Sequence, residues 1–465
     1  MAQGLEEQIQ RGTFRLGDQV PSVRELSRQH RVSVSTVLQA YFWLENRGWI
    51  EARPKSGFYV RLPLEKMSPE PAYRQVLCKP VAVDTGELIL EVMQGCAGSP
   101  RHVSFSAATL SADCLPLHRI NTIIRQISRQ KPAHSAGYDM PPGSLGLRQQ
   151  IAKRSVTAGC NFLPQDVSIT CGAMEGLNLC LRAIARPGDV IALETPTYFN
   201  VIQAIESLGM KAIEIPTHSR TGMDLDALEN AIKKHHVRGV ISMTNCHNPL
   251  GYILPDDLKK ALVELLARYE VPLIEDDVYG DLAFAHDRPR SAKSFDRNGL
   301  VIVCGSFSKT ISPGLRVGWI HTDRYRAKIE QLKFISSIAS PSLSQLVVES
   351  FLKSGGYDRH LRRLRMMLQQ QVHSVSQAVA KYFPEGTRIS RPAGGYVLWV
   401  ELPKRIDAVA VYRKALAHGI SISPGPIFSA SGRFKNCIRL NCGQSWSGEV
   451  DRALLKLGRI CENPS

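Results

Sequence analysis

Four short segments, each directly after an apolar run, carry residue types that chemistry needs. In S-F-S-K the amine of Lys309 lies among hydroxyls, and such a lysine is a candidate to form a Schiff base with a carbonyl compound. In E-D-D-V-Y the carboxylate of Asp276 could hold a protonated ring nitrogen. T-N-C-H-N-P-L-G contains Asn248, and the small residues of C-G-A-M-E-G open a helix whose N–H groups could hold a phosphate. Each segment alone also fits a helix cap, a surface lysine or a turn, but the four in order predict one site.

These segments must be positioned by strands, which we predict at 167–170, 189–193, 211–215, 239–243, 272–275, 300–304 and 317–321. Helical stretches separate several of the strands. Residues from about 101 to 465 are therefore predicted to form an α/β unit with a largely parallel sheet. Ligand-binding groups gather at the carboxyl ends of parallel strands, which is where Asp276 and Lys309 are expected.

Residues 1–60 are predicted to form a separate compact unit. A short helix comes first, and the capping-box spacing from Ser22 to Glu25 starts a second helix. A turn leads to a third helix from Ser33, and two short extended segments joined by a basic turn follow. Helix, helix, turn, helix and hairpin is the order of a winged helix-turn-helix.

The exposed face of the third helix would present short hydroxyls and an amide, which suit phosphate and base-edge contacts in a major groove. An arginine at the start of the second helix and two basic residues in the wing could reach phosphates or the minor groove. The candidate DNA contacts are Ser33, Ser35, Thr36, Gln39, Arg24, Arg53 and Lys55. The alternative is a small helical protein-binding domain in which these polar residues are merely solvated.

The runs G-D-Q-V-P-S-V-R-E-L-S, V-S-V-S-T-V and S-G-F-Y-V resemble the GntR family of bacterial repressors. The match covers nearly all of residues 9–60 and implies binding of double-stranded operator DNA. The residues that it places at the duplex are Arg24, Ser33, Ser35, Thr36 and the wing from Lys55 to Gly57. The family often has an arginine where this chain has Val34, so one contact is expected to be missing and the operator sequence is not inherited.

The ordered set N-P-L-G, D-D-V-Y, S-F-S-K and P-G-L-R-V-G-W resembles the fold-type-I aminotransferases, which bind pyridoxal 5′-phosphate (PLP). The resemblance spans roughly residues 104–460. It implies that Lys309 forms the internal aldimine with the cofactor aldehyde. It also implies that Asp276 keeps the pyridine nitrogen protonated, so that the ring acts as an electron sink. Arg439 would clamp the α-carboxylate of an amino compound as a bidentate ion pair.

The same resemblance implies further residues of the cofactor site. Asn248 and Tyr279 would bond the phenolic oxygen, and Tyr198 would stack on the ring face. Tyr138 would reach the phosphate of the neighbouring subunit, which implies a homodimer. The phosphate itself would be held by Ala173, Met174, Ser306, Ser308 and Arg316.

A GntR-like winged helix fused to an aminotransferase-like domain is the architecture of the MocR subfamily of transcriptional regulators, which the chain resembles from end to end. We therefore expect a DNA-binding domain at 1–60, an irregular linker at 61–100, and a PLP-binding effector and dimerisation domain at 101–465 with a smaller C-terminal α/β subdomain. The leading hypothesis is a cytoplasmic regulator that senses PLP or a small amino compound through an aldimine at Lys309. A working aminotransferase, and a bifunctional protein in which a slow half-reaction is the signal, are the alternatives.

The composition restricts the class of protein further. Of the 465 residues 43% are hydrophobic, which is enough for large cores. No apolar run approaches the ~20 residues of a membrane span, so no membrane partner is expected. The 11 cysteines are scattered without a C-x-x-C pair, which favours reduced thiols over a disulfide framework or a metal site.

The net charge of +16 is unevenly distributed along the chain. Residues 1–60 hold 8 basic and 6 acidic side chains, whereas residues 310–465 hold 23 and 10. The run Y-D-R-H-L-R-R-L-R, on a predicted helix, contributes Arg359, Arg362, Arg363 and Arg365. A solvated helix or salt bridges in a dimer would explain these arginines. The alternative hypothesis is a second basic surface that binds along the DNA.

Overall fold

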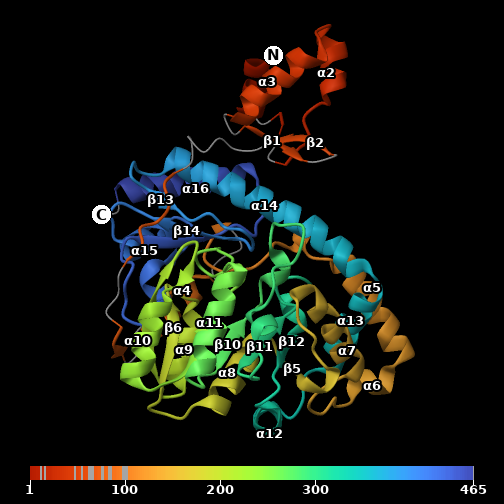
Figure 1. Ribbon diagram of the computed structural model, residues 1–465, viewed down its shortest axis with the longest axis vertical. Coiled ribbons are helices and arrows are strands. Elements are labelled where there is room, and N and C mark those ends of the chain that lie inside the picture. Colours follow the sequence, from red (N-terminus) through yellow and green to blue (C-terminus); the bar gives the residue numbers. More distant parts are fainter. Residues whose placement is uncertain are drawn as a thin grey trace.

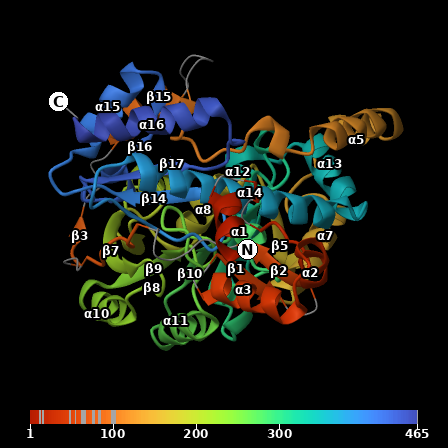
Figure 2. The same ribbon diagram turned by 90° about the horizontal axis from the view of Figure 1, so that it is seen from above.

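The computed structural model describes residues 1–10, 13–14, 17–46, 49–53, 56–60, 68–74, 78–81, 86–96 and 103–463. A small N-terminal unit stands apart from a large unit made of sheets and helices (Figure 1), and it overlies the large unit when seen from above (Figure 2). In the parts of the chain that are described, no helix combines the length and the apolar character that crossing a bilayer needs.

The N-terminal unit is a winged helix-turn-helix, as predicted. Its elements are α1 (Ala2–Gln10), α2 (Val23–His30), α3 (Val34–Asn46), β1 (Ile50–Arg53) and β2 (Gly57–Val60). The capping box is present, because the Glu25 N–H donates to Ser22 Oγ at 3.2 Å and the Ser22 N–H donates to Glu25 Oε2 at 3.1 Å. Leu26, Val37 and Tyr41 are buried in a small core, and β1 and β2 form the antiparallel wing.

The large unit is built on one nine-stranded sheet with the order β3-β7-β6-β9-β10-β11-β12-β5, in which β8 also pairs with β7. The strands are β3 (Pro80–Val81), β5 (Val167–Thr170), β6 (Val190–Thr195), β7 (Lys211–His218), β8 (Gly222–Met223), β9 (Val237–Ser242), β10 (Leu273–Asp276), β11 (Val301–Ser306) and β12 (Gly318–His321). The five strands from β7 to β11 in this order run parallel, whereas β12 is antiparallel to both β11 and β5. The seven predicted strands are confirmed to within three residues at each end, and the sheet is mainly parallel.

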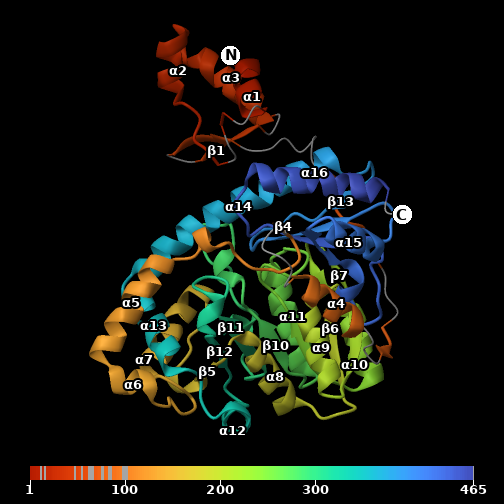
Figure 3. The same cartoon turned by 180° about the vertical axis from the view of Figure 1, so that it is seen from behind.

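Alternate residues of the central strands belong to two hydrophobic clusters, one on each face of the sheet. In β11, Val301 and Val303 belong to one cluster and Ile302 and Cys304 to the other. Helices cover both faces (Figures 1 and 3), because strands that are apolar on both sides need cover on both sides. These helices are α7 (Leu145–Ser155), α8 (Ala173–Ile184), α9 (Phe199–Ser207), α10 (Leu225–His235), α11 (Asp256–Arg268) and α12 (Arg326–Ser337).

A smaller subdomain near the C-terminus has its own antiparallel sheet, of order β13-β14-β17-β16. Its elements are β13 (Arg388–Ile389), β14 (Val397–Glu401), β16 (Ser423–Pro424), β17 (Cys437–Asn441), α15 (Ala408–Ala417) and α16 (Gly448–Glu462). The long helix α14 leads into this subdomain from the large sheet. The remaining elements are α5 (Leu117–Gln130), α6 (Pro132–Ala136), α13 (Ser342–Lys353), α14 (Gly356–Tyr382) and the parallel pair β4 (Val103–Ser104) and β15 (Ile420–Ser421).

The prediction that residues 61–100 are irregular is wrong for two parts of that segment. Residues 80–81 form β3 at the edge of the large sheet. Helix α4 (Gly86–Cys96) packs on the C-terminal subdomain, where the Tyr412 hydroxyl donates to the Glu91 carbonyl at 2.9 Å. The buried stripe of α4, Ile89 and Val92, is one turn long, which is too short for a helical period to stand out in the sequence.

Candidate functional site

Asp276 is the last residue of β10 and pairs in register with Cys304 of β11, in the middle of the sheet. Its side chain is buried, and Oδ1 accepts a 3.3 Å hydrogen bond from the Val278 N–H. Burial raises the pKa of Asp276 to about 7, with Asp277 adding to the rise and Lys309 opposing it. A positive ligand group beside this carboxyl would restore its ionised form, so the position favours a cation.

Lys309 follows β11 and presents its amine to the same region. Nζ donates to the Ala108 carbonyl at 2.7 Å and lies 5.8 Å from the centre of the Tyr279 ring. Burial lowers the pKa of Lys309 to about 8, with Arg439 adding to the fall and Asp276 opposing it. A fraction of the amine is therefore neutral near neutral pH, which is the form that attacks a carbonyl carbon.

The start of α8 forms a cradle for an anion. Gly172 precedes the helix with a φ of 76°, and no side chain caps the helix. A Cβ at Gly172 would lie 2.5 Å from Arg316 Nη2, and a Cβ at Gly318 would overlap the Gly172 backbone, so both glycines keep the space clear. Ser306 pairs with Gly318 across β11 and β12, and its hydroxyl lies 3.0 Å from that of Ser308. Free N–H groups, the helix dipole, a guanidinium and two hydroxyls together suit a phosphate.

Arg439 of β17 is buried where the subdomain meets the large sheet. Nη1 donates to Asn248 Oδ1 at 3.3 Å, and Nη2 donates to Ser423 Oγ at 3.2 Å and to the Ser106 carbonyl. The guanidinium carbon lies 5.1 Å from the centre of the Phe428 ring. These neutral partners hold the arginine in place, and a carboxylate would replace them with stronger charge-assisted hydrogen bonds.

Two tyrosines border the same region. Burial raises the pKa of Tyr198 to about 12, while Arg439 opposes and Asp276 supports that rise. Tyr279 packs edge-on against Tyr396, with ring centres 5.6 Å apart at 70°. Both phenols are protonated at physiological pH, because burial also raises the pKa of Tyr279. They are therefore hydrogen-bond donors as well as ring surfaces.

The structure brings all but one of the predicted cofactor and effector residues together. Those that gather at the carboxyl end of the sheet are Ala173, Met174, Tyr198, Asn248, Asp276, Tyr279, Ser306, Ser308, Lys309, Arg316 and Arg439. The exception is Tyr138, just after α6, whose side chain is 78% exposed in the single chain.

The sequence did not reveal the segment that closes the site beside Lys309. The Ala108 carbonyl accepts from Lys309 and also from the Tyr396 hydroxyl, at 3.1 Å. The Ser423 hydroxyl donates to the Ser106 carbonyl at 2.9 Å. This hydrogen bond joins two of the residues that bind the guanidinium of Arg439. Two alternating S-x-S runs, at 104–106 and 421–423, were the available signal, since they match strands with hydroxyls on one face.

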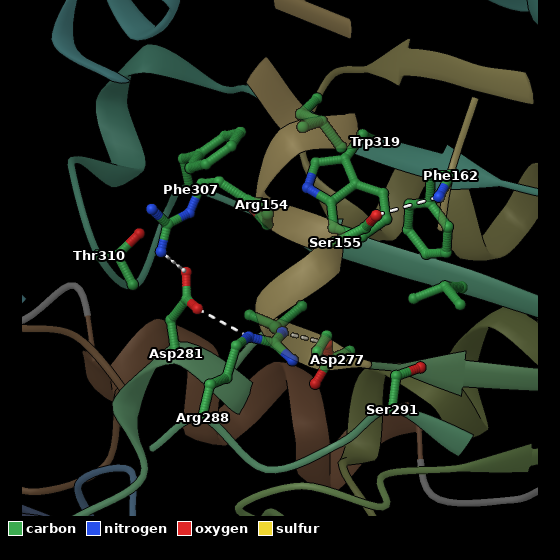
Figure 4. A pocket seen from close by; sticks show the side chains of 15 residues that line it. Arg154, Ser155, Phe162, Asp277, Asp281, Arg288, Ser291, Phe307, Thr310 and Trp319 are labelled. Carbon is green, nitrogen blue, oxygen red and sulfur yellow. Dashed lines mark hydrogen bonds and ion pairs between the residues drawn. The ribbon is translucent and has the colours of Figure 1, made fainter. Parts of the chain in front are cut away.

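A half-buried ion network adjoins the strand end that carries Asp276 (Figure 4). Asp281 accepts from Arg288 Nε at 2.8 Å and lies 3.6 Å from Arg154 Nη2, and Arg288 also binds Asp277. Burial alone would raise the pKa of Asp281, but the two arginines lower it to about 2. Because Asp277 adjoins Asp276 in the chain, the network fixes the strand end that carries the site carboxylate.

The predicted DNA contacts lie on α2, on the first turns of α3 and in the wing. Exposed side chains among them are Arg24, Ser33, Ser35, Thr36 and Gln39. Ser33 Oγ lies 2.7 Å from Ser35 Oγ and 2.8 Å from Thr36 Oγ1, so three hydroxyls cluster at the start of α3. The same turn exposes Val34 by 46%. An exposed apolar group there suits contact with a thymine methyl group rather than a phosphate.

The wing is described in part. Gly57 is exposed with a φ of 104°, and a Cβ there would lie 3.0 Å from Gln19 Nε2, so the turn requires glycine. Lys55 and the side chain of Arg53 lie outside the described residues.

Comparisons with known proteins match both halves of the chain. Residues 1–60 match the bacterial regulatory proteins of the gntR family, and residues 113–457 match aminotransferase class I and II. The chain is 38% identical to the HTH-type transcriptional regulator YjiR of Escherichia coli strain K12, over 98% of this chain and 96% of that protein. It is also 38% identical to YdcR of the same strain, over 99% and 98%. LysN, an α-aminoadipate aminotransferase of Thermus thermophilus solved with N-(5′-phosphopyridoxyl)-L-leucine, aligns with a TM-score of 0.74 and 27% identity, over 82% of this chain and 99% of that chain.

Proposed function

Because the chain belongs to the GntR-family transcriptional regulators that carry an aminotransferase class I and II domain, the architecture of the MocR subfamily, we propose that it is a PLP-dependent regulator that binds DNA as a homodimer. PLP, alone or with a small amino compound, occupies the site around Lys309. Its occupancy changes how the winged helices hold operator DNA. The observation that carries the proposal is the gathering of Lys309, Asp276 and Arg439 beside the open start of α8.

The residues present fit PLP. When bound, PLP supplies an aldehyde carbon that amines attack and a ring that withdraws electrons. Lys309 would bond the aldehyde, and the raised pKa of Asp276 fits a carboxyl that waits for a protonated ring nitrogen. The cleared space between Gly172 and Arg316 fits the phosphate, because a Cβ at the glycine would fill it.

Arg439 points to the chemical class of the second ligand. Its guanidinium is buried and binds Asn248 and Ser423, and a carboxylate is the ligand group that matches the paired donors of an arginine. A neutral fraction of Lys309 would accept the proton of an incoming ammonium group. We therefore expect a small amino acid, with both groups on one carbon, as effector.

The segment between the two units could transmit a structural change from this site to the DNA-binding unit. The Ile389 N–H donates to the Pro69 carbonyl at 2.9 Å, and Glu401 accepts from the Ala72 N–H at 2.9 Å and from Arg74 at 2.6 Å. Glu401 ends β14, and β14 pairs residue by residue with β17, the strand of Arg439. A shift of β17 on carboxylate binding would therefore move the anchor of the winged helix.

An exposed apolar patch supports the homodimer. Tyr138 and Met140 are 78% and 49% exposed, and Phe334, Ile335 and Ile338 are 51%, 68% and 46% exposed. A backbone bridge between residues 139 and 340 brings the two segments side by side. Exposed apolar side chains on neighbouring segments favour a protein interface, and the family resemblance implies that Tyr138 reaches the site of the second copy.

A working aminotransferase is the second candidate function. The lowered pKa of Lys309 favours it, because an amine that is partly neutral near neutral pH can also move protons during catalysis. Steady-state turnover of amino donors with 2-oxoglutarate, far above the rate with PLP in solution, would establish this activity. A single absorbance change on adding an amino acid, without turnover, would instead identify a slow half-reaction as the signal.

The proposal is tested with the full-length protein and a DNA fragment from upstream of its own gene. We expect this fragment to bind more tightly than random DNA of equal length, and its affinity to change when PLP and amino acids are added. Lys309→Ala should abolish the PLP-dependent change but not the binding itself. Equal affinity for the two DNAs would refute the proposal.

A further inference from the structure

We infer that the outer face of α14 and α16 is a second DNA-binding surface, which holds the phosphate backbone of the duplex without reading its bases. The inference rests on the proposed function, because the winged helix must first bring DNA to this side of the large unit. The basic face, as we call it, consists of Arg359, Arg362, Arg363, Lys381, Arg452, Lys456 and Arg459, all exposed.

On α14 the exposed stripe is basic at both ends and contains no acidic residue. Arg359, Arg362 and Arg363 lie on adjacent turns of one face, and Lys381 lies on the same face in the last turn. The one acidic side chain of α14, Asp358, is bound by Arg154 at 2.9 Å. The arginine charges on this stripe are therefore not compensated from their own helix.

Arg365 does not belong to the basic face. Its Nε donates to the Asp281 carbonyl at 2.7 Å and its Nη1 to the His286 carbonyl at 3.3 Å. The arginine run of the sequence therefore divides into three side chains that face solvent and one that anchors the helix. These two contacts give Arg365 a structural role, whereas no hydrogen bond or ion pair of Arg359, Arg362 or Arg363 is found with the residues that the structure describes.

Helix α16 continues the basic face next to α14. Arg452, Lys456 and Arg459 follow one another at spacings of four and three residues, which places them on one side of the helix, and the opposite side is buried. The Tyr382 hydroxyl, at the end of α14, donates to Asp451 at 3.1 Å and joins the two helices. Figures 1 and 3 show both helices along the side of the large unit that faces the winged helix.

The length of α14 matches the repeat of B-DNA. From Arg359 to Lys381 the helix rises by roughly 33 Å at ~1.5 Å per residue. Half-sites on B-DNA recur every ~34 Å, so the two basic ends of α14 can meet phosphates on the same side of one duplex turn.

The covalent connection keeps DNA on this side. The winged helix ends at Val60, and the chain is anchored again at Pro69 by Ile389, next to the C-terminal end of α14. The intervening residues span at most about 30 Å when fully extended. The connection therefore keeps the end of the winged helix within about 30 Å of this anchor.

The distribution of charge along the chain favours a DNA-binding surface outside the winged helix. Residues 1–60 hold 8 basic and 6 acidic side chains, a weak excess for a polyanion partner, whereas residues 310–465 hold 23 and 10. Each phosphate that a basic side chain neutralises releases counterions and steepens the salt dependence of binding. The basic face would supply most of the salt dependence of DNA binding.

The test measures the salt dependence of duplex binding by the full-length protein, using fluorescence anisotropy with a random-sequence 40-base-pair duplex from 50 to 200 mM NaCl. One variant is Arg359→Gln/Arg362→Gln/Arg363→Gln and another is Arg452→Gln/Lys456→Gln/Arg459→Gln. The matched control is Lys211→Gln/Lys234→Gln/Arg297→Gln, three exposed basic residues near the amino ends of the parallel strands. Circular dichroism and thermal unfolding check that all three variants fold.

Losing three phosphate contacts should reduce the magnitude of the negative slope of log K against log salt by about 2.7. The fourfold rise in salt should therefore cost the variant about 40-fold less affinity than it costs the wild type. The control should keep the wild-type slope. The ratio of the affinity for upstream DNA to the affinity for random DNA should stay unchanged in the variants, because phosphate contacts carry no sequence information.

Two results separate the inference from the proposed function. Unchanged slopes in both basic-face variants, or an equal fall in the control, would overturn the inference while leaving the winged helix as the DNA-binding element. If the wild type showed no preference for its upstream DNA while the basic-face slopes still fell, the proposed regulator would be wrong and the phosphate surface would stand.

Discussion

Asp276→Asn should stabilise the PLP-free protein and weaken its affinity for PLP. The substitution keeps the size of the side chain and an oxygen that can accept from the Val278 N–H. It removes the negative charge that burial makes unfavourable. The two opposite effects follow from one cause, because Lys309 only partly offsets the cost of the buried charge, whereas the ring nitrogen of PLP would place a cationic partner beside the carboxylate.

The magnitude follows from the pKa of Asp276. Burial raises it from 3.8 to about 7. Each unit corresponds to about 1.36 kcal/mol, so the ionised carboxyl costs the PLP-free fold about 4 kcal/mol at pH 8. The pKa is higher in the folded state, so below pH 4 both states are protonated and the cost is absent. It grows between pH 4 and pH 7, where only the unfolded state releases the proton, and it is constant above.

Urea unfolding of the PLP-free wild type and variant at pH 5.5 and pH 8, followed by near-UV circular dichroism, measures this effect. The free energy of unfolding of the variant should exceed that of the wild type at both pH values, by about 2 kcal/mol more at pH 8. An absorbance titration with PLP at pH 8 should show a loss of affinity of at least about tenfold, since a charge-assisted hydrogen bond is lost. A stability difference that is the same at both pH values, or a less stable variant at pH 8, would refute the reasoning.

Three further predictions test other parts of the molecule. Gly172→Ala should lower PLP affinity by about tenfold or more in the same titration, because its Cβ would displace Arg316 from the phosphate cradle. Wild-type affinity would show that the cradle does not hold the phosphate. Glu401→Gln should leave PLP affinity unchanged but reduce the PLP-dependent change in DNA affinity, because it weakens the hold on Arg74; an unaltered response in gel-shift titrations would count against this route. Ser22→Ala should destabilise the N-terminal unit by about 1 kcal/mol through loss of the capping box, and calorimetry that finds its unfolding unchanged would contradict this.

The parts of the site that lie on strand ends were predictable from the chain alone. Asp276 ends the short buried strand β10 and Lys309 follows the buried strand β11, and residues at the carboxyl end of a buried parallel strand lie at the ligand-binding edge. The winged helix was predictable for a similar reason, because the capping box at Ser22 and the glycine of the wing are local signals. Local chemistry and the period of apolar residues suffice for such elements.

Contacts between distant segments were not predictable. The Ala108 carbonyl lies 201 residues before Lys309, whose amine it binds. The serines around Arg439 come from two segments, 104–106 and 421–423, that are more than 300 residues apart in sequence. Helix α4 was missed because its buried stripe is only one turn long, and its contact with Tyr412 joins it to the other half of the chain. No spacing within the sequence encodes such meetings.

The sequence by itself determined which residues have the chemistry for PLP, for a carboxylate and for DNA, since residue type and local pattern decide those properties. Only the tertiary structure decided their state. The pKa values of Asp276 and Lys309 shift because folding buries both groups, and Arg439 adds to the fall for Lys309. Likewise the four arginines of α14 are equivalent in sequence, and only the packing of Arg365 against Asp281 separates an anchor from three side chains that face solvent. Burial and proximity are properties of the folded chain. Which charged side chains face solvent, and can therefore bind a partner, is decided only by folding.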